Sequence, residues 1–319
     1  MYYITDNVKN NISLNFEIIA VVSNLLQLTK LIGIEFLTIL LSACSLFAPQ
    51  KVIIGLYDYN SRLSALEGIE IQHVFVGWNN YDTKYTSEQL DKIRDSGKNI
   101  LITLEPWPIF SSNSDSSQLF DDIRAGRYDE KVNLMCDNLA KYPDVIIRWG
   151  HEMDMPSGRY TWSGGNPQKY IESYKHFVDT CRKRAEQVKY MWSPAGNKNL
   201  KEYYPGESYV DYVGLSIYYY PDWQKDYGST FFDLLSSKYE LVKNYKKKII
   251  IAELGVYGSE EMQKKWLEGA TKSFNRFPLL DGLVYFNSTD HPGVWGDLPT
   301  PDWQISESTL KILTGREEN

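Results

Sequence analysis

Two glutamates in this sequence stand where acid–base and nucleophilic chemistry on a sugar would need them. Glu152 lies near the end of the run of residues 144–153, and Glu253 lies near the end of the run of residues 247–255. Such runs are typical of buried strands, so both carboxyl groups are expected at the rim of a sheet. Cleavage of a glycosidic bond needs one carboxyl group to protonate the leaving oxygen and one to attack the anomeric carbon or activate water. The two residues are therefore candidate partners for this reaction.

The two carboxyl groups would have to titrate apart. Glu253 would be ionised and Glu152 protonated at the working pH, and a negative charge on Glu253 would itself raise the pKa of Glu152. The alternative interpretation is that each glutamate only caps a loop or pairs with a lysine. Their occurrence at the ends of the fourth and seventh strands disfavours that alternative, because these strands are roughly opposed across a barrel mouth.

Eight apolar runs alternate with polar or helical stretches after residue 50. The runs cover residues 51–59, 73–78, 99–107, 144–153, 188–194, 210–219, 247–255 and 280–288. Helical spacing of apolar residues marks residues 129–141, 167–187, 231–246, 260–274 and 306–313, and residues 86–89 have the pattern of a capping box. This alternation predicts a (β/α)8 TIM barrel, as a single catalytic domain over residues 51–319.

An open doubly wound sheet is the alternative fold. It would show a glycine-rich phosphate loop after the first strand, and residues 55–59 read Gly-Leu-Tyr-Asp-Tyr instead. The polar stretch at residues 111–117 is expected to be a surface loop.

The motif Arg148-Trp149-Gly150-His151-Glu152-Met153 resembles glycoside hydrolase family 26, whose His-Glu pair it shares, and residues 251–255 resemble the family's nucleophile strand. The resemblance covers nearly all of residues 51–305. It implies that Glu152 is the general acid/base, that Glu253 is the nucleophile, and that configuration is retained. It also implies an endo-acting hydrolase of β-linked polysaccharide, with β-1,4-mannan as the first expectation.

One segment departs from the family pattern. The family's mannanases often carry Asn-Gly after His-Glu-Met and then a Trp, whereas this chain carries Asp154 and a longer segment up to Trp162. A β-glucan, a β-xylan or a bacterial exopolysaccharide are therefore alternative substrates. An alternative of another class is a barrel that binds polysaccharide without cutting it, in export or assembly.

Several residues are expected to support the two glutamates. Arg148 shares strand parity with Glu152, so it should point inward and hold the nucleophile ionised. The resemblance implies that His151 touches the sugar hydroxyl beside the anomeric carbon. It also implies that the hydroxyl of Tyr218 bonds the nucleophile, with the register uncertain by one because two tyrosines follow. Asn197 is expected to bind a sugar hydroxyl from the loop after the fifth strand.

Aromatic residues make up 14% of the chain, with 24 Tyr and 9 Trp. Their flat apolar faces and polar tips match the faces and hydroxyl edges of sugars. Trp162, Trp107 and Trp295 follow strands four, three and eight, so they are the expected sugar platforms. The weaker candidates are Trp78, Trp192 and Trp223.

The bulk composition limits the classes of partner. With 41 acidic against 34 basic residues and a net charge of −7, the chain of 319 residues lacks the basic face that nucleic acid requires. No ligand spacing implies a metal, and no organic cofactor is implied. Cys136 and Cys181 are expected to be free and buried, since nothing in the sequence supports a disulfide. A monomer that binds polysaccharide is expected.

The first residues read as an export signal. The apolar run at residues 31–43 is too short to span a membrane and ends in Leu41-Ser42-Ala43-Cys44, which resembles a bacterial lipobox. We therefore expect residues 1–43 to be removed, Cys44 to be lipidated, and residues 44–50 to tether an exported, membrane-anchored lipoprotein. The alternative is an N-terminal helix packed on the barrel.

Overall fold

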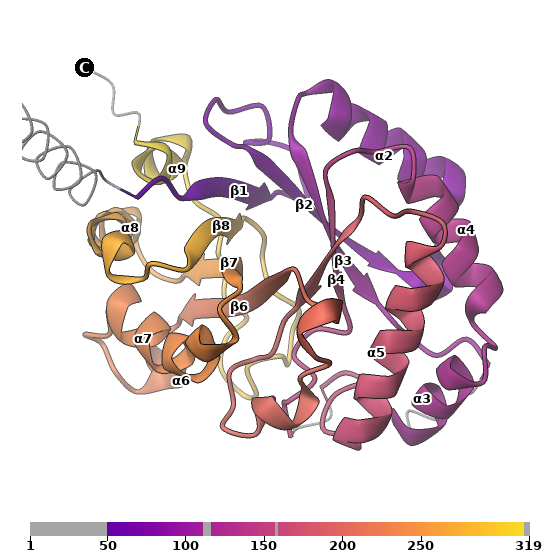
Figure 1. Cartoon of the computed structure of the whole chain (residues 1–319). Helices are drawn as coiled ribbons and strands as arrows, with labels where there is room; N and C mark the ends of the chain where they lie inside the picture. Colours follow the sequence, from indigo (N-terminus) through magenta and orange to yellow (C-terminus); the bar gives the residue numbers. More distant parts are fainter. Residues whose placement is uncertain (1–49, 111–115, 157–158, 316–319) are drawn as a thin grey trace, which may run out of the picture. The chain divides into compact units, whose positions relative to one another are not determined.

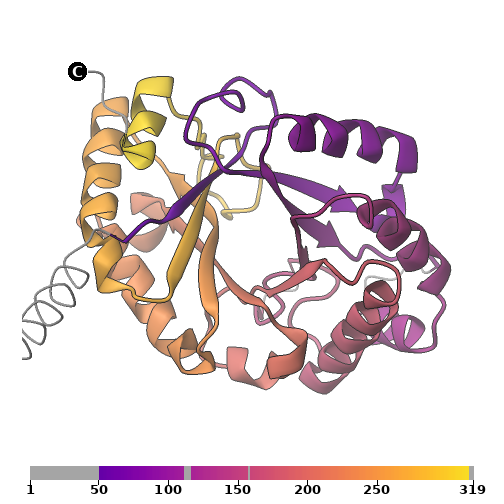
Figure 2. The same cartoon turned by 45° about the horizontal axis from the view of Figure 1, so that its top comes forward.

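Eight parallel strands close into a barrel in the computed structural model, which describes residues 50–110, 116–156 and 159–315. Each strand pairs with the next along the chain, and β8 pairs with β1 (Figures 1 and 2). The strands are β1 (Ile53–Tyr57), β2 (Ile71–Gly77), β3 (Asn99–Glu105), β4 (Val145–Trp149), β5 (Lys189–Trp192), β6 (Tyr212–Tyr219), β7 (Lys248–Val256) and β8 (Leu280–Phe286). The predicted fold class is confirmed.

Helices form the outer layer of the barrel, and the described ones include α2 (Thr83–Asp95), α3 (Ser116–Arg124), α4 (Asp129–Leu139), α5 (Pro167–Arg182), α6 (Pro221–Gln224), α7 (Phe231–Val242), α8 (Glu260–Ser273) and α9 (Glu307–Thr314). The five predicted helices are confirmed within a few residues. The predicted capping box at residues 86–89 is wrong, because Asp82 caps α2 by accepting from the Tyr85 amide at 2.7 Å.

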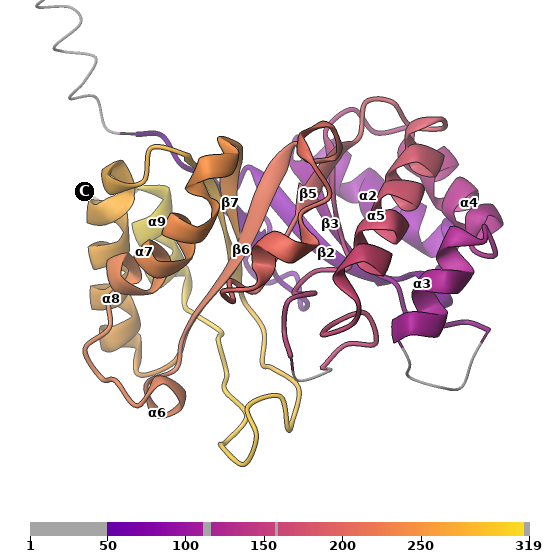
Figure 3. The same cartoon turned by 60° about the horizontal axis from the view of Figure 1, so that its bottom comes forward.

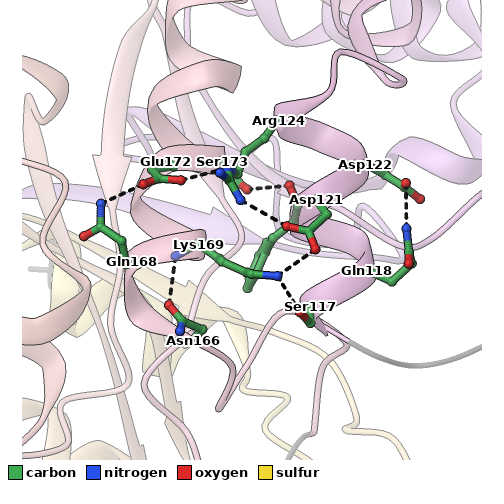
Figure 4. A network of polar contacts seen from close by, with 11 residues as sticks. Ser117, Gln118, Asp121, Asp122, Arg124, Asn166, Gln168, Lys169, Glu172 and Ser173 are labelled. Atoms are coloured by element: carbon green, nitrogen blue, oxygen red, sulfur yellow. Dashed lines mark hydrogen bonds and ion pairs between the residues drawn. The ribbon is translucent and has the colours of Figure 1, made fainter.

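Two helices, α3 and α6, were not predicted. α3 begins inside the polar stretch taken for a loop, and the rest of that stretch, residues 111–115, lies outside the described residues. Figure 4 shows how α3 packs along α5 through charged side chains. Lys169 contacts Asp121 at 2.6 Å, and Arg124 contacts Glu172 at 2.7 Å. These pairs are partly exposed, so each adds on the order of 0–1 kcal/mol to stability.

The barrel interior is built in layers. A lower layer of apolar side chains comes from six strands: Ile71, Leu101, Ile146, Met191, Ile250, Ala252 and Val284. Side chains two residues apart on a strand share a face. The next inward residues after Leu101, Ile146 and Met191 are Thr103, Arg148 and Ser193, all fully buried. A polar layer therefore rests on an apolar one and faces the carboxyl ends of the strands.

A bulge in β7 sets the position of Glu253. Leu215 of β6 pairs with Ile251, but the next residue, Ser216, pairs with Glu253, so Ala252 is an extra residue on β7. A bulge of this kind redirects the side chain that follows it. Here it brings Glu253 level with Ser216.

A disulfide joins α4 to α5, which corrects the expectation of free cysteines. Cys136 and Cys181 are bonded, with Cα atoms 5.3 Å apart, and both side chains are buried. No pattern in the sequence marks this pair, because the two positions become neighbours only when the two helices pack side by side.

Replacing both cysteines by alanine should lower the free energy of unfolding by about 2–4 kcal/mol, because the bond closes a long loop in the unfolded chain. The separation of the two residues is 45. Urea denaturation of the oxidised protein and of the double variant measures this difference. Coincident unfolding curves would contradict it.

Candidate active site

Glu152 stands on a tight turn rather than on a strand. β4 ends at Trp149, earlier than predicted, and both Gly150 and Glu152 have left-handed backbones, with φ of +53° and +54°. The expected strand parity from Arg148 to Glu152 therefore stops at the end of β4. Left-handed φ costs a residue with a Cβ on the order of 1–2 kcal/mol. The amide of Glu152 donates to the Ser193 carbonyl at 2.7 Å, which holds the turn in place.

Glu253 is held from two sides. Arg148 donates from Nη1 to one carboxylate oxygen, and the hydroxyl of Tyr218 donates to the other at 2.5 Å. Tyr218 is therefore the tyrosine in register, as expected, and the two that follow are not. One donor is a charged guanidinium and the other a neutral hydroxyl, so each carboxylate oxygen has a partner. Only 10% of the Glu253 side chain is exposed, so a ligand can touch its carboxylate but few water molecules can.

Arg148 connects the two glutamates. Its Nε donates to the Ser193 hydroxyl at 2.8 Å, and its Nη2 donates to the Ser216 hydroxyl at 3.2 Å. Ser216 also hydrogen-bonds the side chain of Glu152, while the Ser193 carbonyl accepts from the Glu152 amide. One fully buried guanidinium thus fixes the nucleophile directly and Glu152 through two serines.

The pKa of Glu152 is raised. Burial is the main cause and the charge of Glu253 adds to it, while Arg148 and Arg159 oppose it. An acid that keeps its proton beside an ionised carboxylate is the arrangement that glycoside cleavage requires. Sequence reasoning expected the effect of Glu253; burial could be known only from the structure.

His151 is buried beside this pair as a neutral imidazole. Burial, and then the charge of Arg148, lower its pKa well below the usual value. None of the described residues hydrogen-bonds its Nδ1, and its carbonyl accepts from the indole of Trp162 at 2.7 Å. This nitrogen is itself enclosed, so the contact of His151 with a sugar hydroxyl stays a prediction.

The expected tryptophans occupy different positions. Trp107 and Trp295 are partly exposed, whereas Trp162 is 0% exposed and has no free face for a sugar in this structure. Trp162 instead stacks on Tyr160 with ring centroids 4.7 Å apart. Of the weaker candidates, Trp78 and Trp192 are fully buried, and Trp223 is 52% exposed.

In the segment that departs from the family pattern, Asp154 forms a set of hydrogen bonds to residues 195–197. The buried carboxylate of Asp154 accepts hydrogen bonds from three successive amides, those of Ala195 at 2.6 Å, Gly196 at 3.1 Å and Asn197 at 2.8 Å. The side-chain amide of Asn197 donates to the Asp154 carbonyl at 3.3 Å. The structure therefore uses Asn197 to join the loop after β5 to the Glu152 turn.

Asp154→Ala should lower both stability and turnover. It leaves three amides without their acceptor, which costs about 3 kcal/mol, and it loosens the turn that carries Glu152. Asp154→Asn keeps one acceptor oxygen, so its stability and its turnover should lie between those of Asp154→Ala and of the wild type. Thermal melting and initial rates on one substrate measure both effects. An Asp154→Ala protein with wild-type melting and rate would contradict the claim that these hydrogen bonds hold the turn that carries Glu152.

Sequence reasoning missed two polar groups around the pair. Glu105, at the end of β3, accepts from the indole of Trp107 at 3.0 Å, and its pKa is raised by burial and by Glu253. Lys238 of α7 donates to the Ser216 carbonyl at 2.7 Å, beside the β7 bulge. The signal for Glu105 was its strand-end position. Nothing marked Lys238, since only packing brings α7 to β6.

Across the described ranges, no group of three or more His, Cys, Asp or Glu side chains is arranged to hold a metal ion. The chemistry of the pair needs only the carboxyl groups and their hydrogen-bond partners.

The comparisons with known proteins agree with this geometry. Residues 104–256, which include both glutamates, match the model of Glycosyl hydrolase family 26. Endoglucanase H of Acetivibrio thermocellus is 25% identical over 78% of this chain and 27% of its own length. Beta-1,3-xylanase of Alcaligenes sp is 20% identical over 61% of this chain and 38% of that protein. Mannan endo-1,4-beta-mannosidase of Bacillus subtilis is 26% identical over 46% of this chain and 42% of that protein. The chain thus spans well under half the length of these curated relatives.

Among solved structures, a GH26 beta-mannanase from Bacteroides ovatus matches with a TM-score of 0.56 at 15% identity, covering 74% of this chain and 80% of that one. The cellulose synthase subunit Z from Clostridioides difficile matches with a TM-score of 0.55 at 14% identity, covering 83% of this chain and 99% of that one. At these identities the likeness shows the fold alone.

Proposed function

Because the segment that carries both glutamates is of the glycoside hydrolase family 26 type, we propose that this protein is a retaining, endo-acting hydrolase of β-linked polysaccharide. The observation that carries the proposal is the asymmetry of the pair. Glu253 accepts hydrogen bonds from the Arg148 guanidinium and the Tyr218 hydroxyl, while burial raises the pKa of Glu152.

The reaction then follows as a double displacement. The Glu152 carboxylic acid protonates the leaving oxygen while a Glu253 oxygen attacks the anomeric carbon, forming a glycosyl ester and releasing the first product. Esterification removes the negative charge of Glu253, so the pKa of Glu152 falls. Glu152, now ionised, takes a proton from water as that water attacks the ester, and free Glu253 is restored.

We propose β-1,4-mannan as the substrate. The resemblance in the Arg148–Met153 motif and the match to the mannosidase of Bacillus subtilis support it. A β-glucan is the second candidate, because Endoglucanase H aligns over more of this chain and the segment after Glu152 departs from the mannanase pattern. A β-xylan or a bacterial exopolysaccharide would use the same chemistry.

Reducing-sugar release from mannan, glucomannan, mixed-linkage glucan, xylan and bacterial exopolysaccharide tests the proposal. Release from mannan with the product anomer retained by NMR is the expected result. Release from glucan alone would move the protein to the second candidate. Binding without release from any polymer would favour a non-catalytic binding barrel.

We also propose that the protein is exported and anchored through Cys44. Residues 1–43, Cys44 and all of the predicted tether at 44–50 except its last residue lie outside the described residues. Among the residues described, no helix is long and apolar enough to cross a membrane. The buried disulfide supports an oxidising compartment. Intact-mass analysis of the native protein tests this, and a product that retains residues 1–43 would contradict it.

A further inference from the structure

Trp223 is an exposed aromatic residue at the end of the barrel that carries the glutamates. It lies in α6, directly after β6, and 52% of its surface is exposed. Figure 3 shows α6 and the loop after β8 at the same end of the barrel. The loop contributes Trp295, whose ring meets that of Trp223 edge to face with centroids 5.3 Å apart.

The position of Trp223 is fixed by its neighbours. The Gln224 side chain donates to the Tyr218 carbonyl at 2.5 Å and accepts from the Tyr220 amide at 2.8 Å. The Tyr220 hydroxyl donates to the Pro299 carbonyl at 2.8 Å, which ties α6 to the loop after β8. A rigid exposed ring loses little conformational freedom when a ligand stacks on it.

Ring contacts connect Trp223 to the nucleophile. Trp295 touches Trp223 on one side and Tyr218 on the other, with ring centroids 5.8 Å apart, and Tyr218 hydrogen-bonds Glu253. The indole of Trp295 is itself held by Asp290 at 2.7 Å. A glycan that reaches Glu253 and extends along this row would meet the exposed face of Trp223.

We propose that Trp223 forms a distal subsite that stacks on a sugar unit of the β-linked chain, several units away from the bond that is cut. This inference rests on the proposed function. The occupant is a glycan because the row is continuous with the glutamates, and because a flat indole matches the C–H face of a pyranose ring. The subsite favours long chains, and Trp223 thereby contributes to endo action.

The experiment compares chain lengths. Rates are measured on β-1,4-mannobiose and mannohexaose, and on cellobiose and cellohexaose, for the wild type, Trp223→Ala and Trp223→Leu. Leucine still covers Trp295 but offers no stacking face. In both variants the ratio of kcat/KM on the hexaose to that on the biose should fall about five- to tenfold, mainly through KM. Leu134→Ala, which changes an exposed residue on α4, is the control.

A second measurement does not depend on turnover. Binding of each hexaose to Glu253→Gln is followed by calorimetry, with and without Trp223→Ala, and a five- to tenfold weaker Kd is expected. An unchanged hexaose-to-biose ratio and Kd, or equal losses on both lengths, would overturn the distal subsite. Failure of the proposed function looks different: the wild type releases no product, while the effect of Trp223 on binding can still be measured.

Discussion

Glu253→Ala should abolish turnover, with kcat lower on the order of 10⁵-fold, because the proposed glycosyl ester forms on the carboxylate that this variant lacks. The barrel should still fold. The loss of the carboxylate leaves the buried Arg148 without its main charged partner, which costs about 3–5 kcal/mol of stability. Initial rates on the best polymer of the substrate panel measure the first effect, and circular dichroism with thermal melting measures the second.

Glu253→Gln is the matched control. Its amide oxygen can still accept from Arg148, so it should melt at a higher temperature than the alanine variant while being equally inactive. Wild-type-like activity in either variant would remove Glu253 from the nucleophile role.

The loss of activity in Glu152→Ala should depend on the leaving group of the substrate. Polymer cleavage should fall by about 10²–10⁴-fold, because the leaving sugar oxygen needs a proton, whereas aryl glycosides with acidic phenols should lose far less in the first step. Steady-state and burst kinetics on the two substrate types measure this. Equal losses on both would argue against an acid role.

The pH dependence follows from the raised pKa of Glu152. Activity on polymer should decline as the pH rises through this pKa, since the acid loses its proton, and Glu152→Gln should lack that alkaline limb. The contribution of Glu152 to the stability of the fold changes with pH in the same direction. A folded pKa above the unfolded value means that ionisation opposes folding, so the contribution is present at low pH and lost as the pH rises through the folded pKa.

Much of this molecule follows from pattern. Continuous apolar runs predicted the strands and period-3.6 hydrophobicity predicted most helices, because parallel strands are buried on both faces and each helix buries one stripe. The two glutamates and Arg148 were singled out because strand ends converge at one end of a barrel, and Tyr218 was singled out by the family resemblance. These inferences need only the order of residues along single elements.

The remainder depends on contacts between distant elements. Asp154 binds amides from the loop after β5, and Lys238 reaches the Ser216 carbonyl from a helix. The disulfide between Cys136 and Cys181 is of the same kind. Trp162 failed as a platform because sequence position does not reveal burial. The hydroxyl groups of Thr103, Ser193 and Ser216 accept from Arg148, and sequence reasoning named none of them.

The left-handed backbone of Glu152 has a consequence for how this chain can change. Glycine or asparagine would relax that conformation, yet neither can deliver a proton to a departing sugar. Selection for robustness and selection for catalysis therefore pull this one position in opposite directions. Gains in thermal tolerance would have to accumulate elsewhere, in loops and helix surfaces remote from the turn.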